Sequence, residues 1–298
     1  MAIDGLLGLL RVRQWYKNLL IFLGLVFSFN LTNFDLYPPF ITGYVLLCLV
    51  SGANYAINDI VDRDKDASHP EKKNRPLPSG RASLNEAYGL IAVLLVVSFV
   101  GGYYLNTKFA ILLGLLFLTS QFYNLVARKV VVLDLIVISS NYIWRALTGI
   151  ALLKGIPHPP VSLWFIFGVF FVALLLAAGK RRGEHAFLGD RAGEFRGTLQ
   201  SYSPAMLDNL INVFSAITIL FYTMYCVNAP IGDSRLMVTI PVVVFIIGRY
   251  LYIVYNKNQN VMDSSRLLDD RPLLLGVALW IFTVMILLYT PLYASVFP

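Results

Sequence analysis

The sequence predicts an all-α, polytopic membrane protein built from nine transmembrane helices. Of its 298 residues, 57% are hydrophobic and 14% are charged, whereas an ordinary soluble domain carries about 25% charged residues. The mean hydropathy is +0.68, and long runs of the chain contain no charge. Because a helix needs about 20 mostly apolar residues to cross the hydrocarbon of a bilayer, these runs are typical of helices that face lipid or one another.

Nine apolar segments are long enough to cross a membrane. They cover residues 14–32, 39–58, 84–105, 108–126, 131–153, 161–179, 204–228, 236–256 and 272–294. Trp15, Tyr16 and Lys17 place the opening turns of the first segment at the membrane interface, where aromatic and basic side chains gather. The apolar stretch before it is too short for a span and lacks the order of a signal peptide, so we expect an interfacial lead-in.

The basic residues of the loops predict the orientation. They cluster at Arg11 to Lys17, Arg63 to Arg81, Arg128 and Lys129, Lys180 to Arg196, and Lys257 to Arg271. The opposite loops carry only Lys108, Lys154 and Arg235. By the positive-inside rule the first side is cytoplasmic. We therefore expect a multi-pass protein of the plasma or inner membrane, with its N-terminus in the cytoplasm and its C-terminus outside.

We expect a single integral-membrane catalytic domain over residues 1–298. Its polar site should be formed by two cytoplasmic loops, residues 59–83 and 180–203, which carry more ionisable groups than topology requires. Loops of this length in a compact protein are usually functional or disordered. The structural alternative is a positively charged cytoplasmic surface that only sets the topology.

Four acidic or amide side chains close the second apolar segment and predict a metal site. Asn58, Asp62 and Asp66 are four residues apart and share one face of a helix, with Asp59 beside them. Carboxylates arranged in this way repel one another. A hard cation such as Mg²⁺ accepts carboxylate and amide oxygens and bridges to phosphate, so its binding would turn the repulsion into attraction.

The loop that follows brings cations next to these carboxylates. Pro70, Pro76 and Pro78 prevent a continued helix and hold basic residues, Arg75 among them, in a bent loop that can fold back over the metal. Carboxylates and cations side by side are typical of a site for a metal-bridged polyphosphate. The metal neutralises one flank of such an anion while Lys and Arg bind the other.

The second loop opens with Lys180, Arg181 and Glu184, which share a face if the sixth apolar segment continues as a helix beyond the interface. Such cations and carboxylates suit phosphate binding. A positive-inside cap with local ion pairs explains the same residues without a substrate.

Three other places are candidates for substrate binding. Lys17 lies in an aromatic and basic cluster that an interfacial belt explains equally well. Tyr123 and Lys129 flank the turn between the fourth and fifth apolar segments. Arg145 lies well inside the fifth segment, where a charge costs a few kcal/mol and needs a partner or a water-filled cavity. We favour a functional role for Arg145 over a buried structural pair.

Several common site types are excluded by spacing. No two histidines have the spacing of metal ligands, and no Walker-type loop, GxSxG or HExxH motif occurs. Cys48 and Cys226 each lie in an apolar run, without a CxxC motif, so neither a disulfide framework nor a zinc or redox site is indicated.

The acidic motif resembles that of a known family. Asn58-Asp59-x-x-Asp62-x-x-x-Asp66, followed by Arg75-Pro76-Leu77, is similar to the first signature of the UbiA superfamily of intramembrane prenyltransferases, and the resemblance extends over nearly the whole chain. It implies a UbiA-like bundle of nine helices with a cytoplasmic-side active site.

The second loop points to one branch of this superfamily. Members that transfer a prenyl group usually carry a second aspartate-rich motif, whereas here Gly179-Lys180-Arg181-Arg182-Gly183-Glu184 stands in its place, with an acidic pair only at Asp190 and Glu194. With Arg13-Gln14-Trp15-x-Lys17-Asn18, His69-Pro70 and Leu199 to Tyr202, this pattern resembles the decaprenyl-phosphate phosphoribosyltransferase branch. The resemblance implies a polyprenyl phosphate as acceptor and phosphoribosyl pyrophosphate as donor, with pyrophosphate released.

The resemblance also implies roles for the candidate residues. Asp59, Asp62 and Asp66 would be catalytic and, with Asn58, would hold Mg²⁺, with Mn²⁺ as an alternative ion. Phosphates would be bound by Lys17, Arg75, Lys180 and Arg181, and the lipid phosphate by Arg145 or Lys129; Tyr123 and Glu184 complete the predicted substrate-binding set. We expect the protein to associate with the membrane and with no nucleic acid. An oligomer is compatible with the sequence. The alternatives are a UbiA-type enzyme that prenylates an aromatic acceptor and, ranked low, a transporter of lipid or solute.

Overall fold

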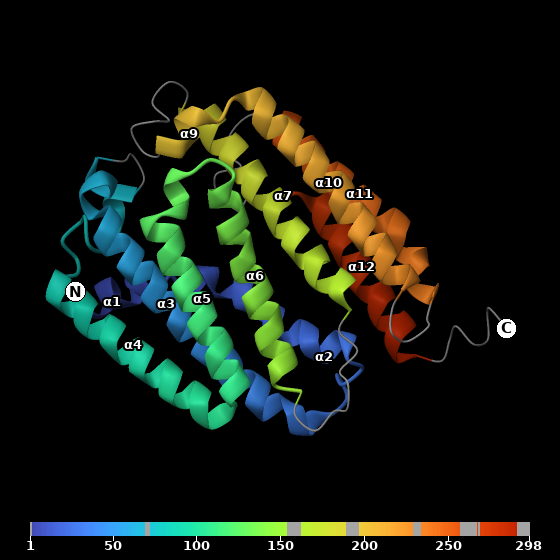
Figure 1. Ribbon diagram of the computed structural model, residues 1–298, viewed down its shortest axis with the longest axis horizontal. Helices are drawn as coiled ribbons and strands as arrows, with labels where there is room; N and C mark the ends of the chain where they lie inside the picture. Colours follow the sequence, from blue (N-terminus) through green and yellow to red (C-terminus); the bar gives the residue numbers. More distant parts are fainter. Residues whose placement is uncertain are drawn as a thin grey trace. The chain divides into compact units, whose positions relative to one another are not determined.

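The structure is a computed structural model that describes residues 2–68, 72–153, 162–188, 197–228, 234–256, 267 and 269–290. Within these ranges every regular element is a helix, as predicted (Figure 1). The chain divides into two compact units. Unit 1 comprises Met1–Arg128 and Ser140–Pro159, and unit 2 comprises Lys129–Ser139 and Pro160–Pro298. The single catalytic domain over residues 1–298 stays a prediction.

Seven helices of the described residues are long and apolar enough to cross a membrane. They cover Phe34–Ala67, Leu84–Leu105, Thr107–Lys129, Leu163–Phe187, Pro204–Val227, Arg235–Asn256 and Arg271–Tyr289. Each coincides with one of the nine predicted segments, so a multi-pass membrane protein is confirmed. The count of nine is not, because among the described residues segment 14–32 forms no single helix of this length, and the helix in segment 131–153 is long enough but less apolar.

These two segments differ from the others for physical reasons. The expected helix over 14–32 is instead a 3₁₀ helix, η1 (Val12–Phe22), continued by the short α2 (Leu23–Phe27). Segment 131–153 does form a helix, α6 (Leu133–Ala151). Its polar residues lower its mean hydropathy below that of the seven other helices; Asp134, Ser139, Asn141 and Arg145 are among them.

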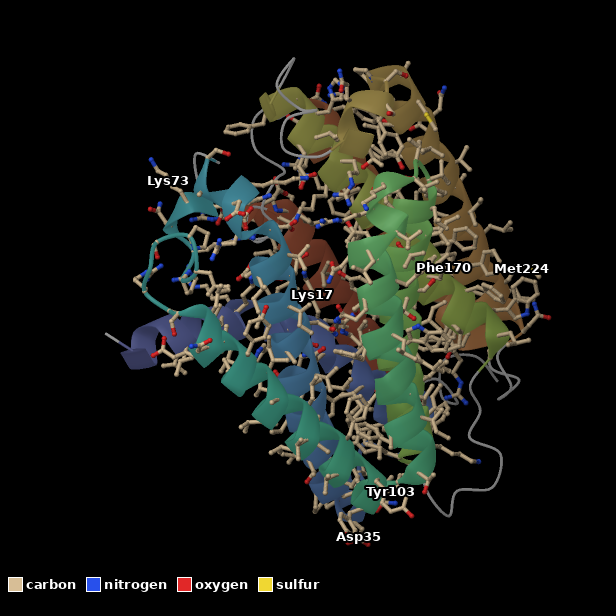
Figure 2. All side chains as sticks on the ribbon, turned by 60° about the vertical axis from the view of Figure 1, so that its left-hand side comes forward. Lys17, Asp35, Lys73, Tyr103, Phe170 and Met224 are labelled. Carbon is tan, nitrogen blue, oxygen red and sulfur yellow. The ribbon has the colours of Figure 1, made fainter. Side chains whose placement is uncertain are left out.

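Unit 1 is built around α3 (Tyr37–Ala67), which packs against η1, α1 (Ala2–Leu10), α4 (Leu84–Leu105) and α5 (Thr107–Leu125). Fully buried Phe40, Leu47 and Phe109 lie in its core. In Figure 2, Lys73 lies at one end of α3 and α4, while Asp35 and Tyr103 lie at the other end. Lys73 therefore lies at the same end of this unit as the acidic end of α3, whereas Asp35 lies at the other end.

Helix ends in unit 1 are set by local hydrogen bonds. Ser83 and Glu86 form a reciprocal capping box at the start of α4. The Asn106 side chain caps α5 and also donates to the carbonyl oxygen of Ala151, at the end of α6. The loop between α3 and α4 contains a short 3₁₀ turn, η3 (Lys72–Asn74).

Unit 2 contains α7 (Leu163–Leu188), α9 (Gly197–Ser201), α10 (Pro204–Val227), the 3₁₀ helix η6 (Ser234–Thr239), α11 (Ile240–Asn256) and α12 (Arg271–Tyr289). α7 packs along α10, and α11 packs on α12. Buried Leu174, Leu207 and Ile247 belong to its core. The condition for Lys180, Arg181 and Glu184 to share a helix face is met, because α7 runs on beyond residue 179 through Lys180 and Glu184.

Candidate active site

The acidic end of α3 is tied to the loop that follows it. One guanidinium nitrogen of Arg75 donates to Asp59 Oδ1 at 3.1 Å and to Asp66 Oδ2 at 2.5 Å. Asp59 and Asp66 are seven residues apart, which is two turns, and so share a face of the helix. Both carboxylates are buried, whereas Arg75 is partly exposed. The predicted return of a basic loop over the acidic helix end is therefore seen at Arg75.

A second arginine reaches the same carboxylate from the N-terminal region. Arg11 follows α1 with a left-handed backbone, φ 47°, and its guanidinium donates to Asp59 Oδ1. It also lies over the ring of Tyr55, 5.2 Å from the ring centre. Two arginines thus meet the buried carboxylate of Asp59, and Arg75 also pairs with Asp66, so the two cations balance the two carboxylates.

Asp62 has a different partner. Arg128, at the end of α5, donates to its Oδ1 at 2.7 Å, and both side chains are about one-fifth exposed. The neighbouring Asp64 is 88% exposed and pairs with the adjacent Arg63. The helix thus separates its aspartates: Asp59, Asp62 and Asp66 are held by residues from other elements, while Asp64 faces solvent.

The donor atoms at this helix end fit a hard divalent cation by their chemistry. Asn58, Asp59, Asp62 and Asp66 offer carboxylate and amide oxygens, the ligands that Mg²⁺ prefers. Asp59 Oδ2 is buried and has no hydrogen-bond partner among the described residues, an arrangement that costs free energy unless another group binds that oxygen. Among the described residues no three His, Cys, Asp or Glu side chains already converge as a cation site. The carboxylates pair instead with Arg11, Arg75 and Arg128.

The other predicted site residues of unit 1 lie on three different helices and differ in burial. Lys17, on η1, donates to Gln14 Oε1 at 3.3 Å and is labelled in Figure 2. Tyr123 is buried on α5, and Arg145 is buried on α6. Arg145 donates from Nε to Asn18 Oδ1 at 2.8 Å and from Nη1 to the carbonyl oxygen of Asn141 at 3.1 Å.

In unit 2 the start of the second basic loop forms a buried network. Arg181, 2% exposed, donates to Asp134 Oδ2 at 3.0 Å and to Glu184 Oε2 at 3.2 Å. The Tyr202 hydroxyl donates to Asp134 Oδ1 at 2.6 Å and accepts from the backbone N–H of Val132 at 2.7 Å. Burial, and then the hydrogen bond to Asp134, raise the pKa of Tyr202, so this hydroxyl keeps its proton and remains a donor.

Lys180 and Lys129 are both exposed, Lys180 on α7 and Lys129 at the end of the 3₁₀ turn η4 (Ala127–Lys129). Lys180 therefore differs from its neighbour Arg181, which is enclosed by carboxylates. His69, Asp190 and Glu194, which contributed to the predicted resemblance, lie outside the described residues.

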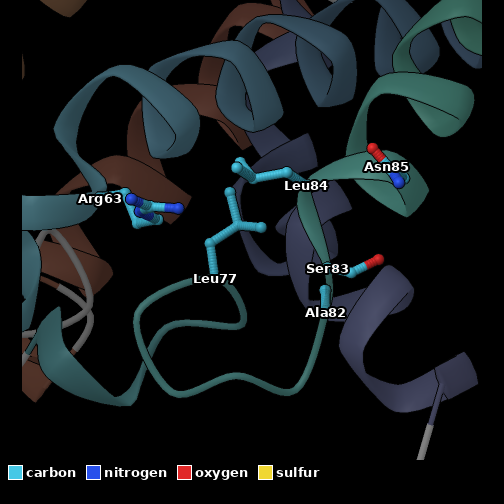
Figure 3. A pocket seen from close by; sticks show the side chains of 6 residues that line it. All are labelled: Arg63, Leu77, Ala82, Ser83, Leu84 and Asn85. Atoms are coloured by element: carbon cyan, nitrogen blue, oxygen red, sulfur yellow. The ribbon is translucent and has the colours of Figure 1, made fainter.

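In unit 1, a surface pocket of about 300 Å³ lies between the end of α3, the loop that follows it and the start of α4 (Figure 3). It is lined by Arg63, Leu77, Ala82, Ser83, Leu84 and Asn85. Its lining contains none of the predicted site residues, and Arg63 pairs with Asp64. We assign no substrate role to this pocket.

Sequence reasoning missed the partners of the acidic residues. Arg11, Arg128 and Tyr202 were noticed only as members of basic or aromatic clusters at helix ends, and Asn18 only as part of a motif. One signal did exist, because Arg11 and Arg128 each lie at an end of an apolar segment that is predicted to be cytoplasmic, the side on which the aspartates are also predicted to lie. Spacing along the chain could not pair them.

Comparison with known proteins identifies the family. The profile of the UbiA prenyltransferase family matches residues 19–268. The chain belongs to this family. A solved structure of a UbiA homologue from Archaeoglobus fulgidus, bound to DMAPP and Mg²⁺, matches this UbiA-family chain with a TM-score of 0.74. The match covers 95% of this chain and 99% of the other at 19% identity, and it establishes the fold.

Sequence relatives of this UbiA-family chain carry a more specific name. The decaprenyl-phosphate phosphoribosyltransferase of Corynebacterium glutamicum is 28% identical over 300 residues, covering 96% of this chain and 87% of the relative. The protein of the same name from Mycolicibacterium smegmatis is 30% identical over 214 residues. That match spans 69% of this chain and 64% of the relative, which is less than two thirds of its length.

Proposed function

We propose that this membrane transferase moves 5-phosphoribose from phosphoribosyl pyrophosphate to a polyprenyl phosphate of the decaprenyl-phosphate type. The observation that carries the proposal is the alternation of carboxylates and arginines at the end of α3, where Arg75 spans Asp59 and Asp66. Such a surface suits a metal-bridged diphosphate. Relatives named for this reaction match nearly the whole chain, which favours this donor and acceptor over others.

The proposed metal centre uses Asn58, Asp59, Asp62 and Asp66. Its ion is Mg²⁺, with Mn²⁺ as a possible substitute, and when bound it supplies stabilisation of the negative charge that develops on the leaving pyrophosphate. The unpaired Oδ2 of Asp59 supports this assignment. Asp59, Asp62 and Asp66 are the proposed catalytic carboxylates, because they would hold the divalent cation that neutralises the leaving pyrophosphate.

The chain's cations bind and orient the substrates. Arg75 and Lys17 are proposed to bind phosphates of the donor, and Lys180, exposed on α7, keeps its predicted phosphate-binding role. Arg181 and Glu184 pair with each other. We therefore propose that they support substrate binding by fixing the end of α7 on which Lys180 lies. Tyr123 keeps its predicted substrate-binding role, and the lipid phosphate is bound by either Arg145 or Lys129.

The transfer needs no strong general base. An oxygen of the lipid phosphate, already an anion at neutral pH, attacks the anomeric carbon of the ribose. The bond between that carbon and the pyrophosphate oxygen breaks, and pyrophosphate leaves with the electron pair. The protein contributes by holding both anions close and in line, which lowers the entropic part of the barrier.

The alternative enzyme is a UbiA-type prenyltransferase with an aromatic acceptor, and a transporter ranks below it. Transport sites tend to lie near the bilayer midplane on broken helices. Here the ion pairs of α3 lie at the end of an unbroken helix, which favours an enzyme at the membrane surface.

The deciding experiment uses the purified full-length protein in detergent. With Mg²⁺, radiolabelled phosphoribosyl pyrophosphate and a polyprenyl phosphate, we expect label to enter the lipid fraction and pyrophosphate to be released. Chelation with EDTA should stop both, and added Mg²⁺ should restore them. Turnover of a prenyl diphosphate with an aromatic acid, without any lipid-linked pentose phosphate, would support the alternative enzyme and refute this proposal.

A further inference from the structure

Arg145 is a buried cation whose charge the described residues do not neutralise. Its side chain lies within α6 and is 8% exposed. No Asp or Glu of the described residues forms an ion pair with it. Burying an arginine inside a membrane helix is energetically costly. A charge kept at this cost is typical of a group that pairs with a ligand.

Neutral groups hold this arginine in one orientation. Asn18 Oδ1 accepts from Arg145 Nε at 2.8 Å and from the Ser51 hydroxyl at 3.2 Å. The amide nitrogen of Asn18 donates to Cys48 Sγ at 3.3 Å, which fixes which amide atom faces the arginine. Asn18 is 1% exposed. Its amide therefore fixes the guanidinium and leaves the positive charge available.

The remaining contacts of Arg145 are also uncharged. Nη1 donates to the carbonyl oxygen of Asn141 at 3.1 Å, and the guanidinium lies 5.6 Å from the centre of the Tyr142 ring. Backbone carbonyls and aromatic faces stabilise a cation without cancelling its charge. The three elements that meet here, η1, α3 and α6, thus form a built site around one arginine.

The depth of this site suits the head of a lipid. Ser51 precedes Asp59 on α3 by eight residues, which is about 12 Å of helix rise. Asn18 and Arg145 therefore contact α3 deeper in the span than the carboxylates do. A water-soluble pyrophosphate donor would enter from the polar end, whereas a lipid phosphate carries a tail that belongs in the hydrocarbon.

We infer that Asn18 is a positioning residue that presents Arg145 as an uncompensated cation to the phosphate of the acceptor lipid. This arrangement selects prenyl phosphates over neutral prenyl alcohols. The inference rests on the proposed function, because it names the group that binds that function's acceptor. It also decides between Arg145 and Lys129 in favour of Arg145.

Substitution Asn18→Asp separates this role from a purely structural one. Aspartate keeps the oxygen that accepts from Arg145 and Ser51 but adds a negative charge, so it would pair with the arginine and compete with the lipid phosphate. A purely structural crosslink would keep its hydrogen bonds to Arg145 and Ser51 and would lose only the weak donation to Cys48 Sγ. Asn33→Asp is the matched control. Asn33 is exposed and precedes α3, so this substitution adds the same negative charge away from Arg145.

The experiment measures binding without turnover. The thermal shift of the detergent-solubilised protein is recorded with farnesyl phosphate and with farnesol. We expect the wild type and Asn33→Asp to prefer farnesyl phosphate, and Asn18→Asp to lose about tenfold or more in affinity for it, as expected for loss of a charge-assisted contact. In turnover, KM for the prenyl phosphate should rise while KM for phosphoribosyl pyrophosphate stays unchanged.

A second variant protects the test against misfolding. Arg145→Gln keeps a hydrogen-bond donor near Asn18 but removes the charge, and it should lose the same preference. Wild-type affinity for farnesyl phosphate in either folded variant overturns the inference. If the wild type binds farnesyl phosphate through these residues but makes no phosphoribosylated lipid, the inference stands and the proposed donor is wrong.

Discussion

Arg75 explains how a helix tolerates so many carboxylates at its end. Carboxylates on one helix face repel one another, and burial of Asp59 and Asp66 would make this worse. One guanidinium contacts both of them, across two helical turns. Both contacts are made by the same nitrogen, Nη1, so the loop has to place only this one atom between the two carboxylates.

The acidic residues should differ sharply in their importance. Asp62→Ala removes a proposed metal ligand that Arg128 holds in place, and we expect turnover to fall by at least a hundredfold, which corresponds to about 2.7 kcal/mol of transition-state stabilisation. Asp64→Ala, two residues away, removes a carboxylate that is 88% exposed, and we expect less than a twofold change. Product formation with labelled donor measures both.

The comparison carries its own control, because both variants remove one carboxylate from the same helix end. Melting temperatures in detergent show whether Asp62→Ala is folded. Near-normal turnover in a folded Asp62→Ala protein would remove Asp62 from the metal centre. Equal losses in both variants would mean that the net charge of the helix end matters, rather than a particular ligand.

At this scale the sequence predicted the carboxylates but not their partners. The spacing of Asn58, Asp62 and Asp66 is local, so helical geometry alone placed them on one face. Arg11 and Asp59 are 48 residues apart, and Arg128 and Asp62 are 66 apart. Contacts at such separations depend on helix packing, which no local pattern in one sequence can supply.

Helix α1 positions the loop that carries Arg75. A Cβ on Gly5 would overlap the carbonyl oxygen of Arg81, and a Cβ on Gly8 would meet the ring of Pro76 at 2.7 Å. The loop backbone therefore lies directly against a glycine-lined face of α1. Arg11 leaves the same helix to reach Asp59, so α1 fixes both arginines of the buried carboxylate.

Gly5→Ala should disturb this contact and thereby the site. Because backbone, not a flexible side chain, stands in the way, we expect a loss of about 1–3 kcal/mol in stability and reduced turnover. Gly89→Ala is the matched control: Gly89 is exposed on α4 with open space around it, and the change should stabilise the helix by roughly 0.5–1 kcal/mol. Thermal melting and product formation measure both effects.

An unchanged melting temperature and turnover in Gly5→Ala would show that α1 can shift without consequence for the loop. Loss of activity in Gly89→Ala as well would indicate that any added methyl group in unit 1 is harmful. Either result would contradict the positioning role of α1.

Elements were predicted well where hydrophobicity decided them and less well where polar side chains did. The seven long apolar helices follow from composition and length. Residues 14–32 were expected to be one span, but Asn18 on η1 is buried and bonded to Cys48, Ser51 and Arg145. These tertiary contacts occur together with a 3₁₀ conformation of residues 12–22, which cannot be predicted from hydropathy.

At the scale of the whole molecule, the positions of the basic residues predict two further membrane crossings. One is made by η1 together with α2, and the other by α6. α3 would begin outside and end at its basic loop, so Arg11 and Lys17 are cytoplasmic only if the chain crosses before Phe34. α5 ends at Arg128, which is predicted to be cytoplasmic, so Lys180, Arg181 and Arg182 at the end of α7 would be cytoplasmic only if α6 crosses. The positive-inside rule thus favours nine crossings, with a polar α6 that tolerates Arg145 because protein surrounds it.

Single cysteines at exposed positions test this topology in intact cells. We expect a membrane-impermeant maleimide to label Thr107→Cys and Leu163→Cys from outside, and Ser79→Cys and Ala186→Cys only after the membrane is permeabilised. The wild type serves as background, because Cys48 and Cys226 are both buried. If α6 does not cross, α7 is inverted, so Ala186→Cys would be labelled from outside and Leu163→Cys protected. That outcome would place Lys180 outside the cell, away from any cytoplasmic phosphoribosyl donor, and so would remove the second basic loop from the proposed site.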